Sequence, residues 1–200
     1  IYTARKAGIR VLTIDEGDEL IAVFKTTGED NVLLATRGGM AIRFDENDVR
    51  PMGRTAAGVR AIRLKDGDEV VAAVRATDED AAVLTVTENG YGKRTRIGEY
   101  SVQNRGGQGL KTYQITQKTG EIVGAKKVTG EEDILLVSDD GTIIRMEAGS
   151  ISLLGRATQG VRLMRPAEGA HVVAMARTER EASEEETAEP GESAEEITEE

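Results

Sequence analysis

Several residue types that support common sites and folds are absent or scarce in this chain of 200 residues. It has no cysteine, no tryptophan and one histidine, and only 3% of its residues are aromatic. The absence of cysteine excludes disulfide bonds, thiolate zinc sites and cysteine nucleophiles, and it fits a reducing compartment. No apolar run approaches the ~20 residues of a membrane-spanning helix. The core must therefore consist of Val, Ile, Leu, Ala and Met.

Bases are outnumbered, with 26 Lys and Arg against 36 Asp and Glu, so the formal net charge is −10. Spread evenly, this charge would repel phosphates and argue against a nucleic-acid partner. However, residues 178–200 carry 11 of the acids and only one base, which leaves 25 of each in residues 1–177. The body is therefore neutral, and inferences about partners must come from it.

The last 23 residues are rich in glutamate and poor in apolar side chains. Such a segment buries too little apolar surface to offset the entropy of ordering, so we expect disorder over residues 178–200. Two interpretations of this acidic tail stay open. It is a solubility tail, or it mimics DNA and competes for a basic surface.

Internal repetition is the strongest feature of the body. Four columns of residues recur every 51 positions: Gly39/Gly90/Gly141, Arg43/Arg94/Arg145, Arg54/Arg105/Arg156 and Gly58/Gly109/Gly160. A partial copy precedes them, because residues 9–23 align with residues 59–73. The repeats are about 1–27, 28–78, 79–130 and 131–177.

Each repeat is typical of four short strands joined by tight turns. One copy has strand-like runs at 59–64, 70–74, 83–86 and 91–95, separated by Asp-Gly-Asp, acidic and Asn-Gly turns. Four antiparallel strands in each repeat predict an all-β propeller, with about three and a half blades present. Because a ring usually has at least four blades, we expect the missing blades to precede Ile1.

Bases and acids occupy different parts of the repeat. The segments before the first strand contain bases and no acids, whereas acids collect in hairpin turns such as residues 66–69. Equivalent positions of a radial array share one rim, so the bases predict a belt that suits the phosphates of a polyanion. The alternative is that these loops are polar and rich in glycine only because they are exposed to solvent, with no ligand involved. The candidate DNA-binding residues are Arg50, Arg54, Gly58, Arg60, Gln103, Arg105, Gly106, Gly107, Gly109, Lys111, Arg156, Gly160 and Arg162.

Three blocks of the body resemble the C-terminal domain of the DNA gyrase A protein, part of a bacterial type IIA topoisomerase. They read VRPMGRTAAGVRAIRLKDGDEVV, LTVTENGYGKRT and ISLLGRATQGVRLMR, and the resemblance extends over residues 1 to about 177. It implies a six-bladed β-pinwheel, a propeller variant whose rim wraps duplex DNA during ATP-dependent negative supercoiling. It also implies a cytoplasmic, chromosome-associated bacterial protein.

The resemblance places catalysis elsewhere. It implies as partners the gyrase B protein in an A2B2 assembly, the rest of the gyrase A polypeptide preceding this chain, and no membrane. It implies no cofactor here, because ATP and Mg act elsewhere in the holoenzyme. The catalytic tyrosine of the family also lies outside this chain, so it is none of Tyr2, Tyr91, Tyr100 and Tyr113.

The family's signature box has the form QRRGGKG, and residues 103–109, QNRGGQG, are a box-like copy. Asn104 and Gln108 replace Arg and Lys, so two of the three positive charges are lost. The resemblance therefore leaves open whether this copy bends DNA as the full box does.

Two other interpretations stay open. The corresponding C-terminal domain in topoisomerase IV is a degenerate propeller that lacks full boxes. A protein-interaction propeller should expose an aromatic or apolar patch, and the low aromatic content counts against it. His171, beside Gly169, is expected to be a turn residue, and the glycines of 106–109 precede no GK[ST] motif or helix of a nucleotide site.

Overall fold

The computed structural model describes residues 8–180. Within this range the regular elements are short strands and three single-turn 3₁₀ helices, so the all-β prediction is confirmed. The strands are β1 (Asn31–Thr36), β2 (Met40–Asp45), β3 (Val70–Arg75), β4 (Ala82–Thr87), β5 (Tyr91–Arg96), β6 (Leu110–Lys111), β7 (Ile122–Val128), β8 (Asp133–Ser138), β9 (Ile143–Glu147), β10 (Val161–Arg162) and β11 (Val172–Thr178). The 3₁₀ helices are η1 (Glu46–Asp48), η2 (Ile97–Glu99) and η3 (Ala148–Ser150).

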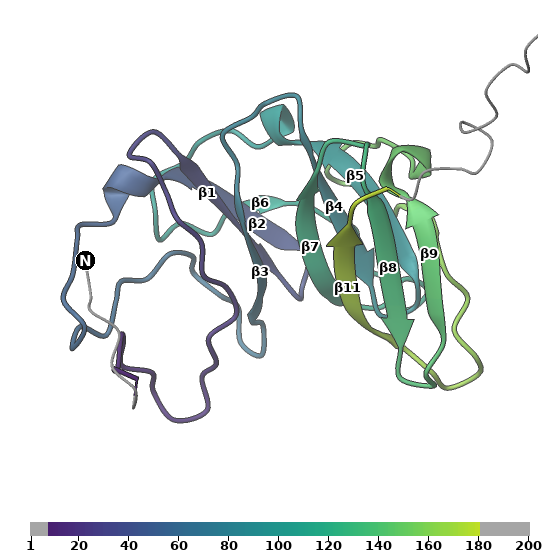
Figure 1. Cartoon of the computed structure of the whole chain (residues 1–200), viewed down its shortest axis with the longest axis horizontal. Helices are drawn as coiled ribbons and strands as arrows, with labels where there is room; N and C mark the ends of the chain where they lie inside the picture. The colour runs from purple at the N-terminus through teal and green to yellow at the C-terminus, as the bar shows by residue number, and fades with distance from the viewer. Residues whose placement is uncertain (1–7, 181–200) are drawn as a thin grey trace, which may run out of the picture.

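The strands form three antiparallel sheets that follow one another along an arc (Figure 1). Their strand orders are β3-β1-β2-β6, β10-β5-β4-β7 and β11-β8-β9. The strands β3, β7 and β11 lie at the inner end of each sheet, and β7 contacts both of the others. Each sheet is thus one blade, with its remaining strands leading outward to a rim.

The outer strand of a blade comes from the following repeat. β6 pairs with β2 in the register Ala41↔Leu110, and β10 pairs with β5 in the register Gly92↔Val161. The expectation that one blade consists of four consecutive strands is therefore wrong, because the outer strand of each of these two blades comes from the next repeat. Residues 59–64, expected to be a strand, form none, whereas the equivalent residues of the next two repeats form β6 and β10.

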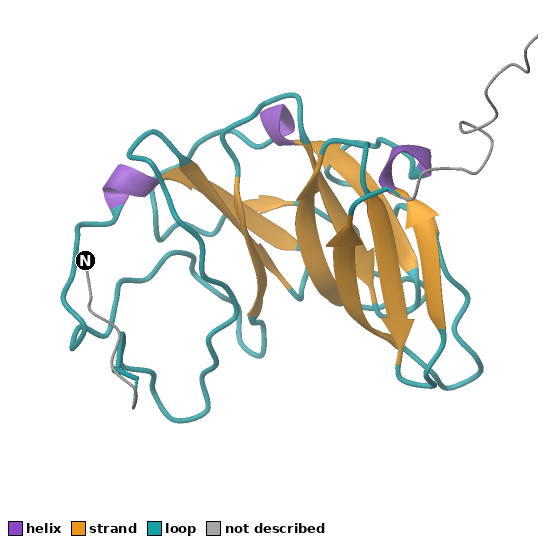
Figure 2. Ribbon diagram, in the orientation of Figure 1, coloured by secondary structure: helices purple, strands orange, loops and turns teal. Residues whose placement is uncertain are grey.

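The partial repeat behaves in the same way. Residues 20–25 align with β3, but in the part of the chain that the structure describes no strand forms before Asn31. An inner strand pairs with the first strand of its own repeat, and residues 20–25 have no such partner among the described residues. The chain consequently forms three blades, and the half blade is an irregular segment (Figure 2).

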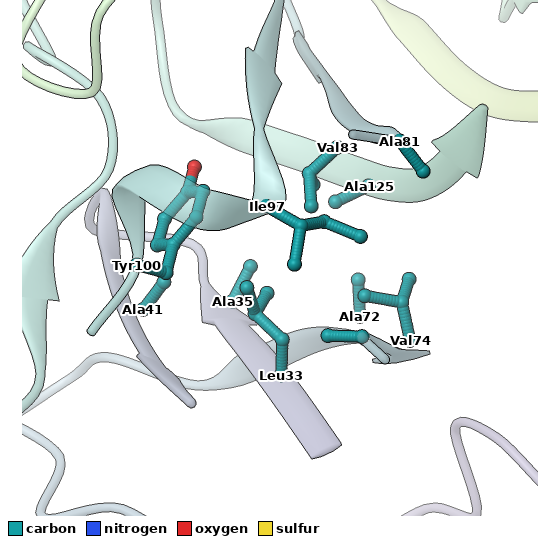
Figure 3. Close-up of a cluster of buried hydrophobic side chains, with 11 residues drawn as sticks. Leu33, Ala35, Ala41, Ala72, Val74, Ala81, Val83, Ile97, Tyr100 and Ala125 are labelled. Atoms are coloured by element: carbon teal, nitrogen blue, oxygen red, sulfur yellow. The ribbon is translucent and has the colours of Figure 1, made fainter. Parts of the chain in front are cut away.

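Small side chains allow the blades to pack closely. Between the first two sheets, Ile97 of η2 meets Leu33, Val74 and Val83 over a layer of alanines (Figure 3). A second cluster, which includes Leu84, Ile134 and Val172, joins the second and third sheets. Every residue of β4 is buried, including its two threonines.

Arg43 and Arg94, two members of the arginine column, tie consecutive repeats together. Arg43 in β2 is 3% exposed, and its guanidinium donates to the carbonyl oxygen of Tyr100 at 3.2 Å. Arg94 in β5 makes the equivalent bond to Ile151, 2.8 Å long. Each of these two arginines thereby holds the residue after the next repeat's 3₁₀ helix. The three 3₁₀ helices lie along one edge of the arc (Figure 2).

The boundary of the acidic tail differs from the expectation. Thr178 is the last residue of β11, and Arg180 forms an ion pair with Glu147 at 2.7 Å. Residues 181–200, which make up most of the expected tail, lie outside the described residues, as do residues 1–7.

Candidate nucleic-acid interface

The segments that link each 3₁₀ helix to an outer strand form the candidate interface. We call residues 50–60, 101–111 and 152–162 the first, second and third rim loops. Backbone hydrogen bonds join each loop to the residues that directly follow the preceding loop, since Gly106 donates to Ala61 and Arg63 donates to Gly107, both at 2.7 Å. Gln114 donates to Thr158 at 3.1 Å across the next junction. The loops therefore succeed one another in a fixed order.

The bases of the rim loops are linked in a series. The Arg105 guanidinium donates to the carbonyl oxygens of Asp48, at 3.0 Å, and Arg60. The Arg156 guanidinium makes the equivalent bond to the carbonyl oxygen of Lys111 at 3.2 Å. Arg105 and Arg156, in the middle of their loops, thus each donate to the backbone carbonyl oxygen of the base that ends the preceding loop. A guanidinium has five N–H donors, and these bonds use only one or two of them.

The bases of the rim loops differ in their exposure to solvent. Arg50, Arg54, Arg60, Lys111 and Arg162 are exposed, whereas Arg105 and Arg156 are half-buried. The three loops contain seven bases and no acid. Exposed bases therefore lie in all three loops, and Arg105 and Arg156 use some of their donors to hold neighbouring loops together.

Two of the three repeat-column glycines of the belt lie where the backbone is too close for a side chain. Gly109 and Gly160 have φ of +76° and +72°, and an added Cβ would lie 2.4 Å from the Ala41 carbonyl oxygen and 2.5 Å from that of Gly92. A side chain therefore does not fit at either position, because the backbone of the paired strand, β2 or β5, is in the way. Gly58, with φ of +84°, has no atom within 4 Å of an added Cβ.

The box-like copy at 103–109 is anchored through its backbone. Gln103 donates its N–H to the Arg43 carbonyl oxygen at 2.7 Å, and Gly106 and Gly107 are half-buried. Asn104 and Gln108 are the exposed residues of this copy. The positions that lack the charges of the signature box are therefore the ones that face solvent.

Three tyrosines support the rim loops. The Arg162 guanidinium lies 4.7 Å from the centre of the Tyr91 ring and donates to its hydroxyl at 2.5 Å. The Tyr113 hydroxyl donates to the carbonyl oxygen of Gln159 at 2.5 Å. The Tyr100 ring centre lies 6.0 Å from the Arg156 guanidinium, and burial raises the pKa of Tyr100. These contacts give the tyrosines structural roles, and Tyr2 lies outside the described residues.

Sequence reasoning missed Lys93, a fully buried residue of β5 that lies beneath the third rim loop. Its ammonium donates to the carbonyl oxygens of Gly155, at 2.7 Å, and Arg156. Burial lowers the pKa of Lys93 to about 8, and the Arg156 charge adds to the effect while Glu99 opposes it. The available signal was the repeat itself, because the equivalent positions 51 residues away are isoleucines.

Bases at the ends of the inner strands each have an acid nearby. Arg75 lies 3.6 Å from Asp30, and Lys127 lies 3.8 Å from Asp78. The third pair joins Arg177 to Glu132 at 3.4 Å. At the ends of β3, β7 and β11, each of these three basic charges is therefore offset by a nearby acidic charge.

The remaining candidates have no site around them. His171 is exposed, and its backbone N–H donates to the Asp139 carboxylate at 2.9 Å, as in a turn. Across residues 8–180, no three His, Cys, Asp or Glu side chains are grouped as a metal site would require. Among those same residues, no helix has the length and apolarity to cross a membrane.

Antiparallel blades that exchange outer strands between repeats define a β-propeller of the pinwheel kind. The chain belongs to the family described as DNA gyrase C-terminal domain, beta-propeller, whose profile matches residues 3–27, 30–77, 81–129 and 132–179. The resemblance found in the sequence is thereby confirmed.

Relatives and solved structures agree with this family. The DNA gyrase A protein of Staphylococcus epidermidis is 47% identical over 177 residues, covering 88% of this chain and 20% of the relative. The DNA gyrase A protein of Klebsiella oxytoca is 43% identical over 182 residues, covering 91% and 21%. The chain thus spans about one fifth of the length of these curated relatives.

Two solved domains have the same fold. A DNA gyrase A C-terminal domain superposes with a TM-score of 0.76 at 30% identity, covering 86% of this chain and 59% of that one. The C-terminal domain of a DNA topoisomerase IV gives 0.83 at 24% identity, covering 89% and 56%. The second likeness establishes the fold alone. The curated relatives favour the gyrase interpretation over the topoisomerase IV alternative.

Proposed function

We propose that this chain binds and wraps duplex DNA on its rim loops, without sequence preference, as part of ATP-dependent negative supercoiling by a gyrase. The observation that supports this most strongly is the series of seven bases and no acids that runs through three interlocked loops. Arginine and lysine hold phosphates at any sequence, and the release of counterions drives such binding.

The proposal assigns different roles to the exposed bases and to the half-buried arginines of the rim loops. The exposed bases Arg60, Lys111 and Arg162 contact phosphates, while Arg105 and Arg156 fix the spacing of the loops and contribute their remaining donors. A fixed spacing suits a stiff duplex, because the phosphates then meet a preformed track. Arg50 and Arg54 extend the track at its first loop, and Gln103 with its neighbouring glycines shapes the second.

The wider assembly is part of the same proposal. We expect this domain to act with the rest of the gyrase A polypeptide, which supplies the catalytic tyrosine, and with the gyrase B protein in an A2B2 complex in the bacterial cytoplasm. In that assembly ATP and Mg²⁺ act on other parts of the enzyme. The domain contributes DNA binding and no catalytic residue.

A protein-interaction role has weaker support. The most exposed large apolar side chains include Val23, 81% exposed, and Ile143, 62% exposed. Val23 lies in an irregular segment, and Ile143 lies in β9, the end strand of its sheet. Single exposed apolar side chains are normal on a protein surface, so they do not favour a docking surface.

The test is the salt dependence of DNA affinity in the Arg162→Gln variant. We expect weaker binding to every duplex sequence, and a slope of log affinity against log salt that falls by about 1, because one phosphate contact is lost. The matched control is Arg96→Gln, which removes an exposed base outside the rim loops that lies 3.8 Å from Asp80. An unchanged slope in Arg162→Gln, or a strong sequence preference in the wild type, would count against the proposal.

A further inference from the structure

A buried charge lies directly under one rim loop. The Lys93 ammonium has three N–H donors, and three acceptors surround it: the carbonyl oxygens of Gly155 and Arg156 and the Thr158 hydroxyl at 3.1 Å. Thr158 in turn donates to the Gly155 carbonyl oxygen at 2.9 Å. The backbone of the third rim loop is therefore organised around this cation.

In the first blade, an apolar side chain takes the place of the buried lysine and supports the loop above it. The position of Lys93 is occupied there by Ile42, which is fully buried, and the position of Thr158 by Gly107. A Cβ added at Gly107 would lie 3.7 Å from the Ile42 side chain, so the second loop rests on an apolar support. The two blades thus differ at both positions, with lysine and threonine in one and isoleucine and glycine in the other. This paired difference links the buried cation to the loop above it.

The charged groups that face Lys93 come from three segments. Arg156, on the loop itself, disfavours the ammonium, whereas Glu99 of η2 favours it. The Tyr113 ring, which follows β6, has its centre 5.1 Å from the ammonium nitrogen. Burial is the largest influence and brings the pKa of Lys93 to about 8. Lys93 therefore titrates close to neutral pH, unlike an exposed lysine.

We propose that Lys93 is a positioning residue whose protonation is coupled to the binding of DNA phosphates at the third rim loop. A phosphate held by Arg156 adds negative charge near the ammonium and stabilises it, because the ammonium donates to the backbone of Arg156 itself. DNA binding then takes up a proton. This inference rests on the proposed function, because it needs phosphates on the rim.

The direction of the pH effect follows from linkage. A phosphate raises the pKa of Lys93, so the complex binds more protons than the separate partners between the two pKa values. DNA affinity therefore falls as pH rises through this window, by about tenfold for each unit by which DNA raises the pKa. At pH 7, where Lys93 is charged in both states, the effect is small.

The experiment measures DNA affinity of the full chain between pH 7 and 9.5 at fixed ionic strength, using one duplex. We expect wild-type affinity to fall with pH, and the Lys93→Met variant to lose that part of the dependence. The matched control is Lys111→Met, which removes an exposed rim lysine. Its binding should be weaker at every pH, with the wild-type pH slope retained. Equal pH slopes for wild type and Lys93→Met would overturn the coupling.

A second measurement needs no variant at Lys93. The side-chain resonances of Lys93 in the wild-type chain report its pKa with and without duplex DNA, and we expect DNA to raise it. A pKa unchanged by bound DNA overturns this inference alone, provided that Arg162→Gln and Lys111→Met still weaken binding. If the wild type does not bind DNA, or if neither rim variant weakens it, the proposed function fails and this inference fails with it.

Discussion

The contact between Gly109 and β2 gives a sharp prediction about how the rim is attached to the blades. Gly109→Ala places a Cβ 2.4 Å from the Ala41 carbonyl oxygen, about 1 Å closer than an ordinary contact, at a φ of +76°. The positive φ costs a residue with a Cβ roughly 1–2 kcal/mol. Relieving the overlap requires β6 to move away from β2, which sacrifices one or two hydrogen bonds of about 1 kcal/mol each.

We therefore expect Gly109→Ala to lower the free energy of unfolding by about 3 kcal/mol. Gly58→Ala is the matched control, because Gly58 has a φ of +84° and no atom within 4 Å of an added Cβ. It should lose only the conformational part, roughly 1–2 kcal/mol. Urea denaturation followed by circular dichroism compares the two variants. Equal losses would show that β6 does not press on β2, and the account of the exchanged outer strand would be refuted.

Two further predictions concern buried cations. Arg43→Met leaves the Tyr100 carbonyl oxygen and Glu79 without their guanidinium partner, so we expect a loss of about 2–3 kcal/mol in urea denaturation, and a loss no larger than that of the exposed Arg96→Met would contradict the role of Arg43. For Lys93, the folded pKa of about 8 lies below the ordinary lysine value of 10.5, so the unfolded chain binds more protons between these values. The free energy of unfolding should therefore rise with pH across this window in the wild type relative to Lys93→Met, by an amount on the order of 3 kcal/mol, and parallel pH profiles would contradict the buried charge.

The sequence predicted those strands whose turns and apolar pattern are local. The runs at 70–74, 83–86 and 91–95 became β3, β4 and β5 with shifts of a residue or less at their ends. The strand expected at 59–64 did not form, although the equivalent residues form β6 and β10, each paired with a strand of the preceding repeat. Register between repeats depends on tertiary packing, and the local pattern contains no record of it.

The candidate site was predicted in part for the same reason. Repeat columns located the basic loops, because bases without acids are visible in composition. They did not separate Arg43, which is buried and structural, from Arg54, which is exposed. Lys93 was missed because a lysine in an alternating strand usually faces solvent, and only its isoleucine counterparts mark the position as buried.

Wrapping of DNA on the rim is the central claim, and a topological assay tests it most directly. The chain is added to relaxed closed-circular DNA, a nicking-closing topoisomerase then relaxes the unconstrained turns, and the topoisomers are separated after the proteins are removed. We expect a shifted distribution with the wild type, and a smaller shift when Arg60, Lys111 and Arg162 are all replaced by Gln. A distribution identical to that of DNA alone, at concentrations where the wild type binds, would contradict wrapping.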